Sequence, residues 1–241
     1  MKRIILYFVL AINVIPFVLN AQTSREENML LHPKEMRLVE IATLTGKGDL
    51  AKLEPALHKG LEAGLTVNQI KESLIHVYAY AGFPRSLRGL QTFMAVMDAR
   101  KAKGINDVVG ADASPISDER SKYERGKAIL EELTGMPEKG AKTGYAAFAP
   151  PIEVFLKEHL FADIFERDVL SHKERELITV SVLAGIGGVE PMLSSHLNIC
   201  LRVGLNPAQL QHFVSIIEQS AGKSEAQAAQ LVLAEVMKKK K

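Results

Sequence analysis

Two parts of this 241-residue chain repeat one another at a single offset of 140 residues. Gly64-Leu65 matches Gly204-Leu205, and Ala81-Gly82 matches Ala221-Gly222. Self-similarity at one fixed offset is the signature of a duplicated structural unit. The sequence therefore predicts two copies of one module. Further pairs at this offset, with no gap, are Leu57 with Leu197, Leu61 with Leu201, Gln69 with Gln209, Ile70 with Leu210, and Val96-Met97 with Val236-Met237.

The second copy is expected to be helical throughout. Apolar residues from Leu193 to Leu201 recur at helical spacing. Gly204 then suits the left-handed position after a helix, and Asn206-Pro207 is a cap followed by proline in the first turn. Gly222 is expected to end that helix and Ser224 to cap the last one.

The first copy has similar signals for the starts and ends of helices. Thr66 with Gln69 three residues later is a capping-box pattern. Gly82 is expected to end this helix, and Pro84 to begin the next. Ala, Leu, Glu and Lys dominate the composition, which favours helices over strands. We therefore predict an all-α fold.

The chain between the copies contains both a linker and further helices. A Gly/Asp/Ser/Pro-rich stretch, residues 104–117, is typical of an exposed linker. It separates a first unit, residues 28–103, from a second unit, residues 118–241. Within the second unit, extra helices are expected over residues 118–133, 151–167 and 171–183.

The N-terminus has the pattern of a secretory signal peptide. Lys2 and Arg3 precede an almost wholly apolar run over residues 4–19, and Ala21 stands at the expected cleavage point. The alternative is a membrane anchor, but the run is short and contains Asn13 and Pro16. We expect residues 1–21 to be removed, leaving a periplasmic or secreted protein with no stable membrane span.

Charge and cysteine content exclude two classes of function. The chain has 30 basic and 28 acidic residues, and the signal segment removes two of the basic ones, so the remainder is formally neutral. Nucleic acid is not expected as a partner, because no excess of cations is present to displace counterions. Cys200 is the only cysteine, so a disulfide within the chain is excluded.

Several segments resemble the carboxymuconolactone decarboxylase family, which shares its fold with alkylhydroperoxidase-D-like proteins. The first copy also resembles a unit of this family, a shorter one, through residues 64–66 and 80–84. The resemblance implies an all-α fold that assembles into a homo-oligomer, and either decarboxylation of a carboxylated muconolactone or thiol-dependent peroxide reduction. It is carried by residues 123–126, 159–161, 167–170, 173–179, 196–197 and 204–205.

The peroxidase alternative is disfavoured. In the peroxidase-type pattern two cysteines stand seven and four residues before the family histidine, His196 here. Those positions hold Val189 and Met192, which cannot form a thiolate. Cys200 lies on the other side of the histidine and is expected to be a small core residue.

The resemblance implies two catalytic candidates. His196 could act as a general acid and base, and Glu176 could orient and stabilise its imidazole. The alternatives are a partly buried structural histidine and a solvated charge at a helix start.

The first copy contributes the candidates for substrate binding. His76 and Tyr80 share a helix face, and Arg85 and Arg88 follow Pro84 on the next helix, where they would suit a carboxylate. Solvated surface arginines are the alternative. The first copy has Ala56 in place of the family histidine, and the second has Ser220 and Glu225 in place of Tyr80 and Arg85. Each copy thus keeps half of a plausible site, and we expect one composite pocket where they pack together.

These observations favour an exported enzyme of the decarboxylase (carboxy-lyase) type acting on a small carboxylated or lactone-like molecule, with no metal and no cofactor. Two alternatives stay open: an oxidoreductase of the same fold, and a non-catalytic ligand-binding or scaffolding protein.

Overall fold

The computed structural model describes residues 30–239, and every regular element in this range is helical. The all-α prediction is confirmed. The signal-peptide prediction falls on residues 1–21, outside the described range. The helices are α2 (Pro33–Lys47), α3 (Leu50–Glu62), α4 (Val67–Ala102), α5 (Lys122–Thr134), α6 (Gly144–Phe148), α7 (Pro150–Phe155), the π-helical η1 (Leu156–Phe165), α8 (His172–Ile186), α9 (Glu190–Arg202), α10 (Pro207–Ser220) and α11 (Lys223–Lys238).

Helix boundaries in the two parts of the chain fall at nearly the same offset as the sequence matches. Helices α3 and α9 start and end 140 residues apart, as do the starts of α4 and α10, while α2 and α8 are 139 apart. Gly64 and Gly204 both adopt positive φ, at 89° and 100°. Three helices of the first part thus have counterparts in the same order in the second.

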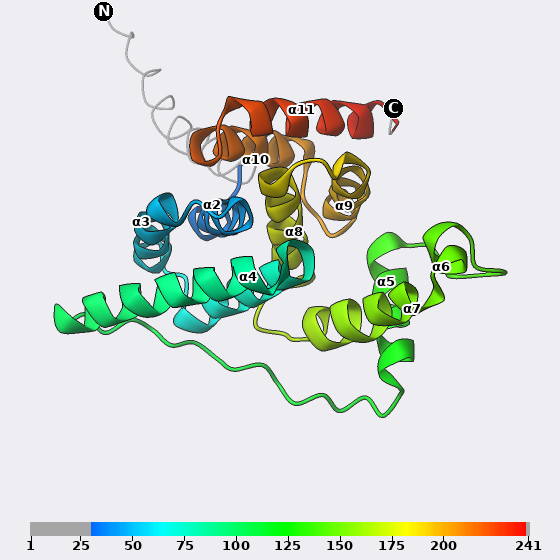
Figure 1. The fold of residues 1–241 in the computed structure, drawn as a ribbon, viewed down its shortest axis with the longest axis horizontal. Helices are drawn as coiled ribbons and strands as arrows, with labels where there is room; N and C mark the ends of the chain where they lie inside the picture. The colour runs from blue at the N-terminus through cyan, green and yellow to red at the C-terminus, as the bar shows by residue number, and fades with distance from the viewer. Residues whose placement is uncertain (1–29, 240–241) are drawn as a thin grey trace, which may run out of the picture.

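The centre of the molecule is the contact between α2 and α8 (Figure 1). Helix α8 is buried over almost its whole length. The two helices can approach closely because each has a glycine at the contact, Gly46 in α2 and Gly185 in α8. A Cβ at Gly185 would lie 2.7 Å from the Thr43 carbonyl oxygen, and a Cβ at Gly46 would lie 3.2 Å from Val182 Cγ1. Any larger residue at Gly185 would force the helices apart.

The hydrophobic core is shared between the first and second units. One cluster combines Leu31 and Val39 with α8 to α11, and another combines α2, α3 and α4 with Leu170, Ile178 and Val182. The two predicted units therefore pack into one shared core. Each unit needs the other to bury its apolar helix faces.

Helix α4 contains the sharp break predicted at Gly82, which has φ 78° and ψ 164°. A conformation with positive φ is readily adopted only by glycine. The second segment turns back on the first, so that a Cβ at Gly89 would lie 2.9 Å from Leu74 Cδ2. The break leaves Tyr80 near the end of the first segment, beside α8 and α9.

The predicted caps of α4 and α10 are confirmed. Gln69 N donates to Thr66 Oγ1 (3.1 Å), and Thr66 N donates to Gln69 Oε1 (3.0 Å). Asn206 and Gln209 make the same reciprocal pair. The predicted cap of α11 is wrong: Gly222 occupies the N-cap, and Ser224 already lies inside the helix.

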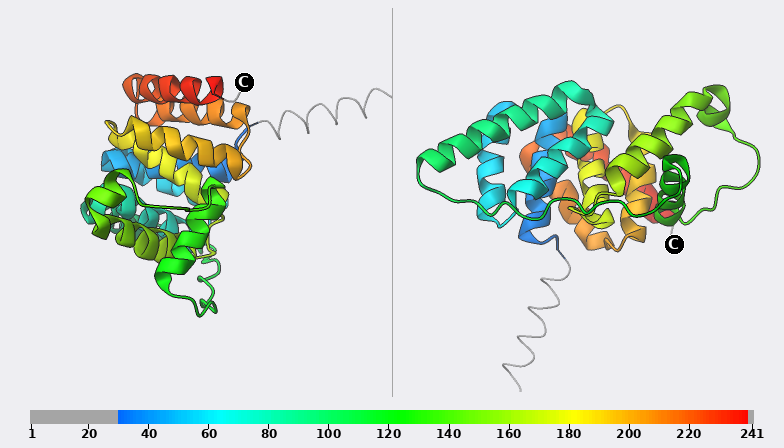
Figure 2. Two further views of the ribbon diagram at one scale, coloured as in Figure 1. Left: turned by 90° about the vertical axis from the view of Figure 1, so that its right-hand side faces the viewer. Right: turned by 90° about the horizontal axis from the view of Figure 1, so that it is seen from below.

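Residues 104–117 run as an extended stretch along the body and are attached at several points (Figures 1 and 2). Val67 N donates to the Val108 carbonyl, Asn68 binds the stretch with its side-chain amide, and Ser114 N donates to Asp168. Beyond it, α5, α6, α7 and η1 form an arm at one side of the molecule (Figure 2). A third apolar cluster, around Leu133 and Phe161, joins the arm to α9. None of the helices between residues 30 and 239 is long and apolar enough to cross a membrane.

Candidate functional site

Glu176 and His196 form a hydrogen-bonded pair between α8 and α9. Glu176 Oε2 lies 2.8 Å from His196 Nδ1, the Glu176 side chain is fully buried, and 15% of the His196 side chain is exposed. A carboxylate oxygen only accepts, so Nδ1 carries the hydrogen and donates it. Within residues 30–239, nothing is hydrogen-bonded to His196 Nε2. That nitrogen is therefore available to take or give a proton.

Tyr80 brings the first part of the chain to this pair. Its ring stands edge-on to the His196 ring, with centroids 5.7 Å apart and an interplanar angle of 85°. It also packs against all three apolar clusters, so it lies where they meet. Burial and the negative charge of Glu176 raise the pKa of the Tyr80 phenol well above its usual range. The phenol is consequently a neutral group that can donate a hydrogen bond.

His76 lies behind Tyr80 and is fully buried. Its Nδ1 is 3.3 Å from Arg175 Nη1, and its Nε2 is 2.9 Å from Thr179 Oγ1. A guanidinium only donates, so Nδ1 must accept and Nε2 must donate to Thr179. Burial first, and then the charges of Arg175 and His196, hold the pKa of His76 well below its usual value. This arrangement fixes His76 as a neutral imidazole whose two nitrogens are both engaged.

Arg175, which contacts His76, forms a buried ion pair with Glu72. Arg175 Nη2 donates to Glu72 Oε1 at 2.7 Å, and Arg167 Nε donates to the same oxygen at 2.9 Å. The side chains of Arg175 and Glu72 are 0% and 3% exposed. This ion pair was not predicted from the sequence, because Arg175 stands in a charged run at a helix start. The spacing of Glu72, His76 and Tyr80 at four-residue intervals was the available signal.

Buried polar atoms without a hydrogen-bond partner gather where α4 faces α8. Among the described residues these are Ser73 Oγ, Tyr80 OH, Arg175 Nε and Glu176 Oε1. An unsatisfied buried polar group costs about 1–3 kcal/mol, so native structures supply such groups with water or with a ligand atom. Tyr80 OH, which has Thr179 as a polar neighbour, and Glu176 Oε1 each lack a hydrogen bond of normal geometry, and both lie beside His196. A bound hydroxyl, carbonyl or water oxygen would satisfy unmet hydrogen-bonding capacity here.

The structure does not bring the two predicted arginines to this cluster. The Arg85 guanidinium lies against Gly48, which ends α2, and Arg88 Nη1 donates to Gln91 on the same helix. Both arginines are exposed. Of the six predicted site residues, four therefore lie together: His76, Tyr80, Glu176 and His196.

The positions that a thiol peroxidase would need lie at the start of α9. Val189 is the N-cap of that helix and Met192 is in its first turn. Cys200 is fully buried, and burial together with the charge of Glu176 raises the pKa of its thiol well above the usual value. A thiol in that state is a poor nucleophile.

Changing His76 is expected to alter how stability depends on pH. The unfolded imidazole titrates near 6.5, whereas the folded one titrates well below. Between these values the unfolded state binds more protons, so the native chain loses stability as pH falls below about 6.5. We expect His76→Gln to flatten this dependence by at most about 1.4 kcal/mol per pH unit. Urea unfolding between about pH 7 and pH 5 measures it, and equal slopes for both proteins would contradict this account.

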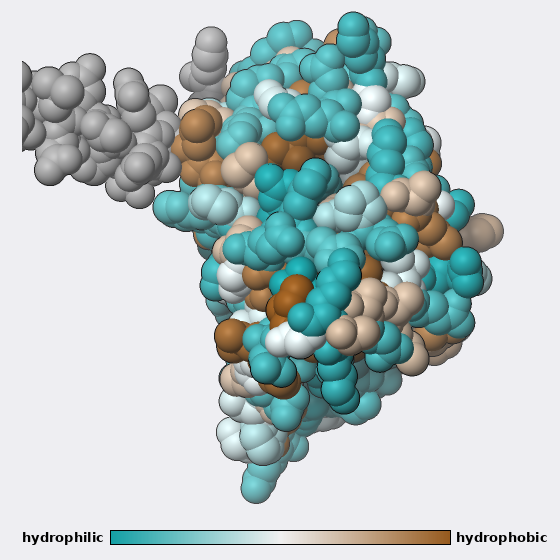
Figure 3. Space-filling view, turned by 90° about the vertical axis from the view of Figure 1, so that its left-hand side faces the viewer, coloured by the Kyte–Doolittle hydropathy of each residue, from teal (hydrophilic) through white to brown (hydrophobic). Residues whose placement is uncertain are grey.

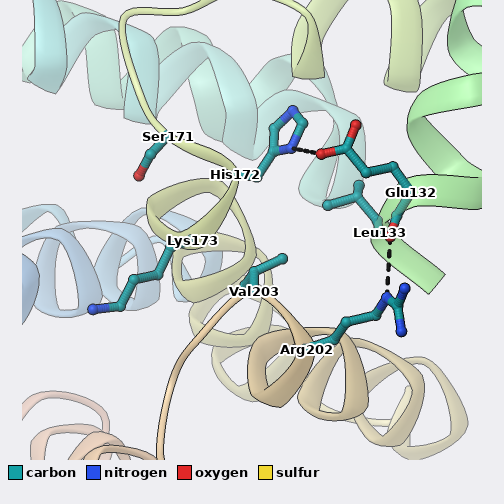
Figure 4. Close-up of a pocket in the computed structure, with 7 residues that line it drawn as sticks. All are labelled: Glu132, Leu133, Ser171, His172, Lys173, Arg202 and Val203. Atoms are coloured by element: carbon teal, nitrogen blue, oxygen red, sulfur yellow. Dashed lines mark hydrogen bonds and ion pairs between the residues drawn. The ribbon is translucent and has the colours of Figure 1, made fainter. Parts of the chain in front are cut away.

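A surface cleft of about 660 Å³ lies between α5, α8 and α9 (Figure 4). His172 Nδ1 is 3.6 Å from Glu132 Oε1, and Arg202 Nε donates to the Glu132 carbonyl at 3.1 Å across it. None of the predicted site residues lines this cleft. Among the residues that the structure describes, no three His, Cys, Asp or Glu side chains are grouped as a metal ion would require.

Comparison with known proteins gives one family. The model of the carboxymuconolactone decarboxylase family matches residues 150–235, a range that contains Glu176 and His196. Among curated proteins, none matches the chain.

Proposed function

We propose that this chain is an acid–base carboxy-lyase acting on a small carboxylated or lactone-like molecule. The match of residues 150–235 to the model of the carboxymuconolactone decarboxylase family supports this proposal. The observation that carries the proposal is the Glu176–His196 pair, with its free Nε2 beside the Tyr80 ring.

In the proposed reaction the bond between the substrate carbon and its carboxylate breaks and CO2 leaves. The electron pair stays on the carbon as an enolate. His196 enters this step as the imidazolium, with a hydrogen on each nitrogen, and donates the Nε2 proton to that carbon. It becomes the neutral imidazole with its hydrogen on Nδ1, and Nε2 then regains a proton from solvent. Glu176 accepts from Nδ1 throughout, so it holds the ring in position and stabilises its charged form. A fixed charge of this kind needs no rearrangement during the reaction.

Tyr80 is proposed to bind an oxygen of the substrate. Its hydroxyl is a neutral donor without a hydrogen bond of normal geometry, at the same site as His196. A hydrogen bond from it to the enolate oxygen would strengthen as negative charge develops there, which is the requirement for lowering the barrier. Arg85 and Arg88 make no contact with this group, so the proposal does not depend on them.

The matching helix boundaries support the proposal that residues 28–103 and 118–241 are tandem units of one fold. Their composite site would join Tyr80 of the first with Glu176 and His196 of the second. We also propose, from the sequence pattern alone, that residues 1–21 direct export and that the protein acts as a homo-oligomer.

The test is to incubate the protein with a set of carboxylated lactones and β-keto acids in D2O, without any thiol, and to measure the release of CO2. We expect deuterium at the carbon that loses CO2, and about 10²-fold slower turnover for Glu176→Gln. The matched control is Glu174→Gln on the same helix, since glutamine also supports the capping box that Glu174 makes with Ser171. Saturable binding of these compounds with no CO2 release would instead favour a non-catalytic ligand-binding protein.

A further inference from the structure

A second cleft, of about 280 Å³, lies between α2, α3 and α10. Apolar Met36 and Ile216 contribute to its lining, and Arg37 and Lys59 bring positive charge to it. The end of the molecule that includes α3 is mostly hydrophilic, with hydrophobic residues in separate spots (Figure 3). The remaining lining residues are Glu40, Gln219 and Ser220.

This cleft occupies the position in the first part of the chain that corresponds to the candidate active site. Helices α2 and α8 are related by 139 residues, which relates Arg37 to Glu176, and the offset of 140 relates Ile216 to His76 and Ser220 to Tyr80. The three elements correspond as well: α2, α3 and α10 have the same places in the repeat as α8, α9 and α4. Three of the seven lining residues are thus counterparts of three of the four clustered site residues.

The acid–base pair is absent from this position. The counterpart of His196 is Ala56, which is buried, and the counterpart of Glu176 is Arg37. The cleft therefore lacks the carboxylate–imidazole pair to which the proposed proton transfer is assigned. A molecule bound in this cleft would therefore be held and released unchanged.

The charges of the cleft favour an anion. Arg37 is paired with Glu40 on the same helix turn. Lys59 makes no ion pair with any described residue, and its side chain is exposed. One positive charge is left uncompensated, next to the apolar surface of Met36 and Ile216. A carboxylate near Lys59 with an apolar body against these two residues would satisfy both features.

We propose that this cleft is a second, non-catalytic binding site for a small monocarboxylate with an apolar body. The site is distinct from the His196 centre in position and in chemistry. Binding at this site does not require the protein to be an enzyme, because it depends only on the cleft and its charges.

Benzoate is a suitable probe, titrated into the ¹⁵N-labelled protein and followed by amide chemical shifts. We expect saturable shifts at Lys59 and Gln219, with Lys59→Ala weakening binding about threefold to tenfold and Lys59→Arg retaining it. The control is Lys101→Ala, an exposed lysine that does not line the cleft. His196→Ala should leave these shifts unchanged.

Two results would overturn the proposal. One is the absence of saturable shifts around α2, α3 and α10. The other is binding that Lys59→Ala and Lys101→Ala weaken equally, which would indicate general charge attraction. Failure of the decarboxylation assay has no bearing on either result, so the two proposals stand or fall separately.

Discussion

Replacing His196 with alanine is expected to lower turnover about 10³-fold while leaving the fold intact. The substitution removes the group whose Nε2 gives the proton, and Glu176 loses its hydrogen-bond partner. His196 is partly exposed, so water can enter the space left by the ring. The rate of CO2 release from the best substrate of the proposed set measures the effect.

The control for this change is Asn198→Ala on the same helix. Asn198 is exposed and, among the residues that the structure describes, donates only to the Ser194 carbonyl. We expect its turnover and thermal unfolding to match those of the native chain. If His196→Ala retained turnover within a few-fold of this control, His196 would be a structural residue.

Replacing Arg175 with methionine is expected to lower the free energy of unfolding by about 3 kcal/mol. Glu72 would stay buried with one of its two guanidinium partners gone, and His76 Nδ1 and the Arg167 carbonyl would each lose a donor. Removing one member of a buried pair costs about 3–5 kcal/mol, and we expect the lower end because Arg167 still reaches Glu72.

The matched variant is Arg167→Met, which removes the other partner of Glu72. Its side chain is 40% exposed, so we expect it to cost no more than about 1 kcal/mol. Urea unfolding with an unchanged m-value measures both. Equal effects of the two variants would contradict the view that burial makes Arg175 the essential partner.

The sequence predicted the helices well because their ends depend on local chemistry. Capping residues such as Thr66 and Asn206, and glycines with positive φ such as Gly64 and Gly82, act within a few residues of their own position. Because the two parts match at an offset of 140, helix ends predicted in one part also indicated helix ends in the other. Ser224 was misassigned as a cap because Gly222 can serve as one, which left Ser224 inside the helix.

The site was only partly predictable, because its residues meet through tertiary packing. Family resemblance implied Glu176 and His196, and helical spacing placed His76 with Tyr80. The pairing of Glu72 with Arg175 joins residues 103 positions apart and depends on how α4 lies on α8. Arg85 and Arg88 follow the break at Gly82, and a sequence does not show in which direction a chain with positive φ leaves such a turn.

The most direct measurement of the central claim is the tautomer of His196, read from ¹⁵N chemical shifts of the labelled protein at alkaline pH. The account predicts a neutral imidazole with its hydrogen on Nδ1, facing Glu176, and a bare Nε2 beside Tyr80. The hydrogen on Nε2 instead, or rapid averaging between the two nitrogens, would contradict the claim that Glu176 prepares His196 for acid–base chemistry.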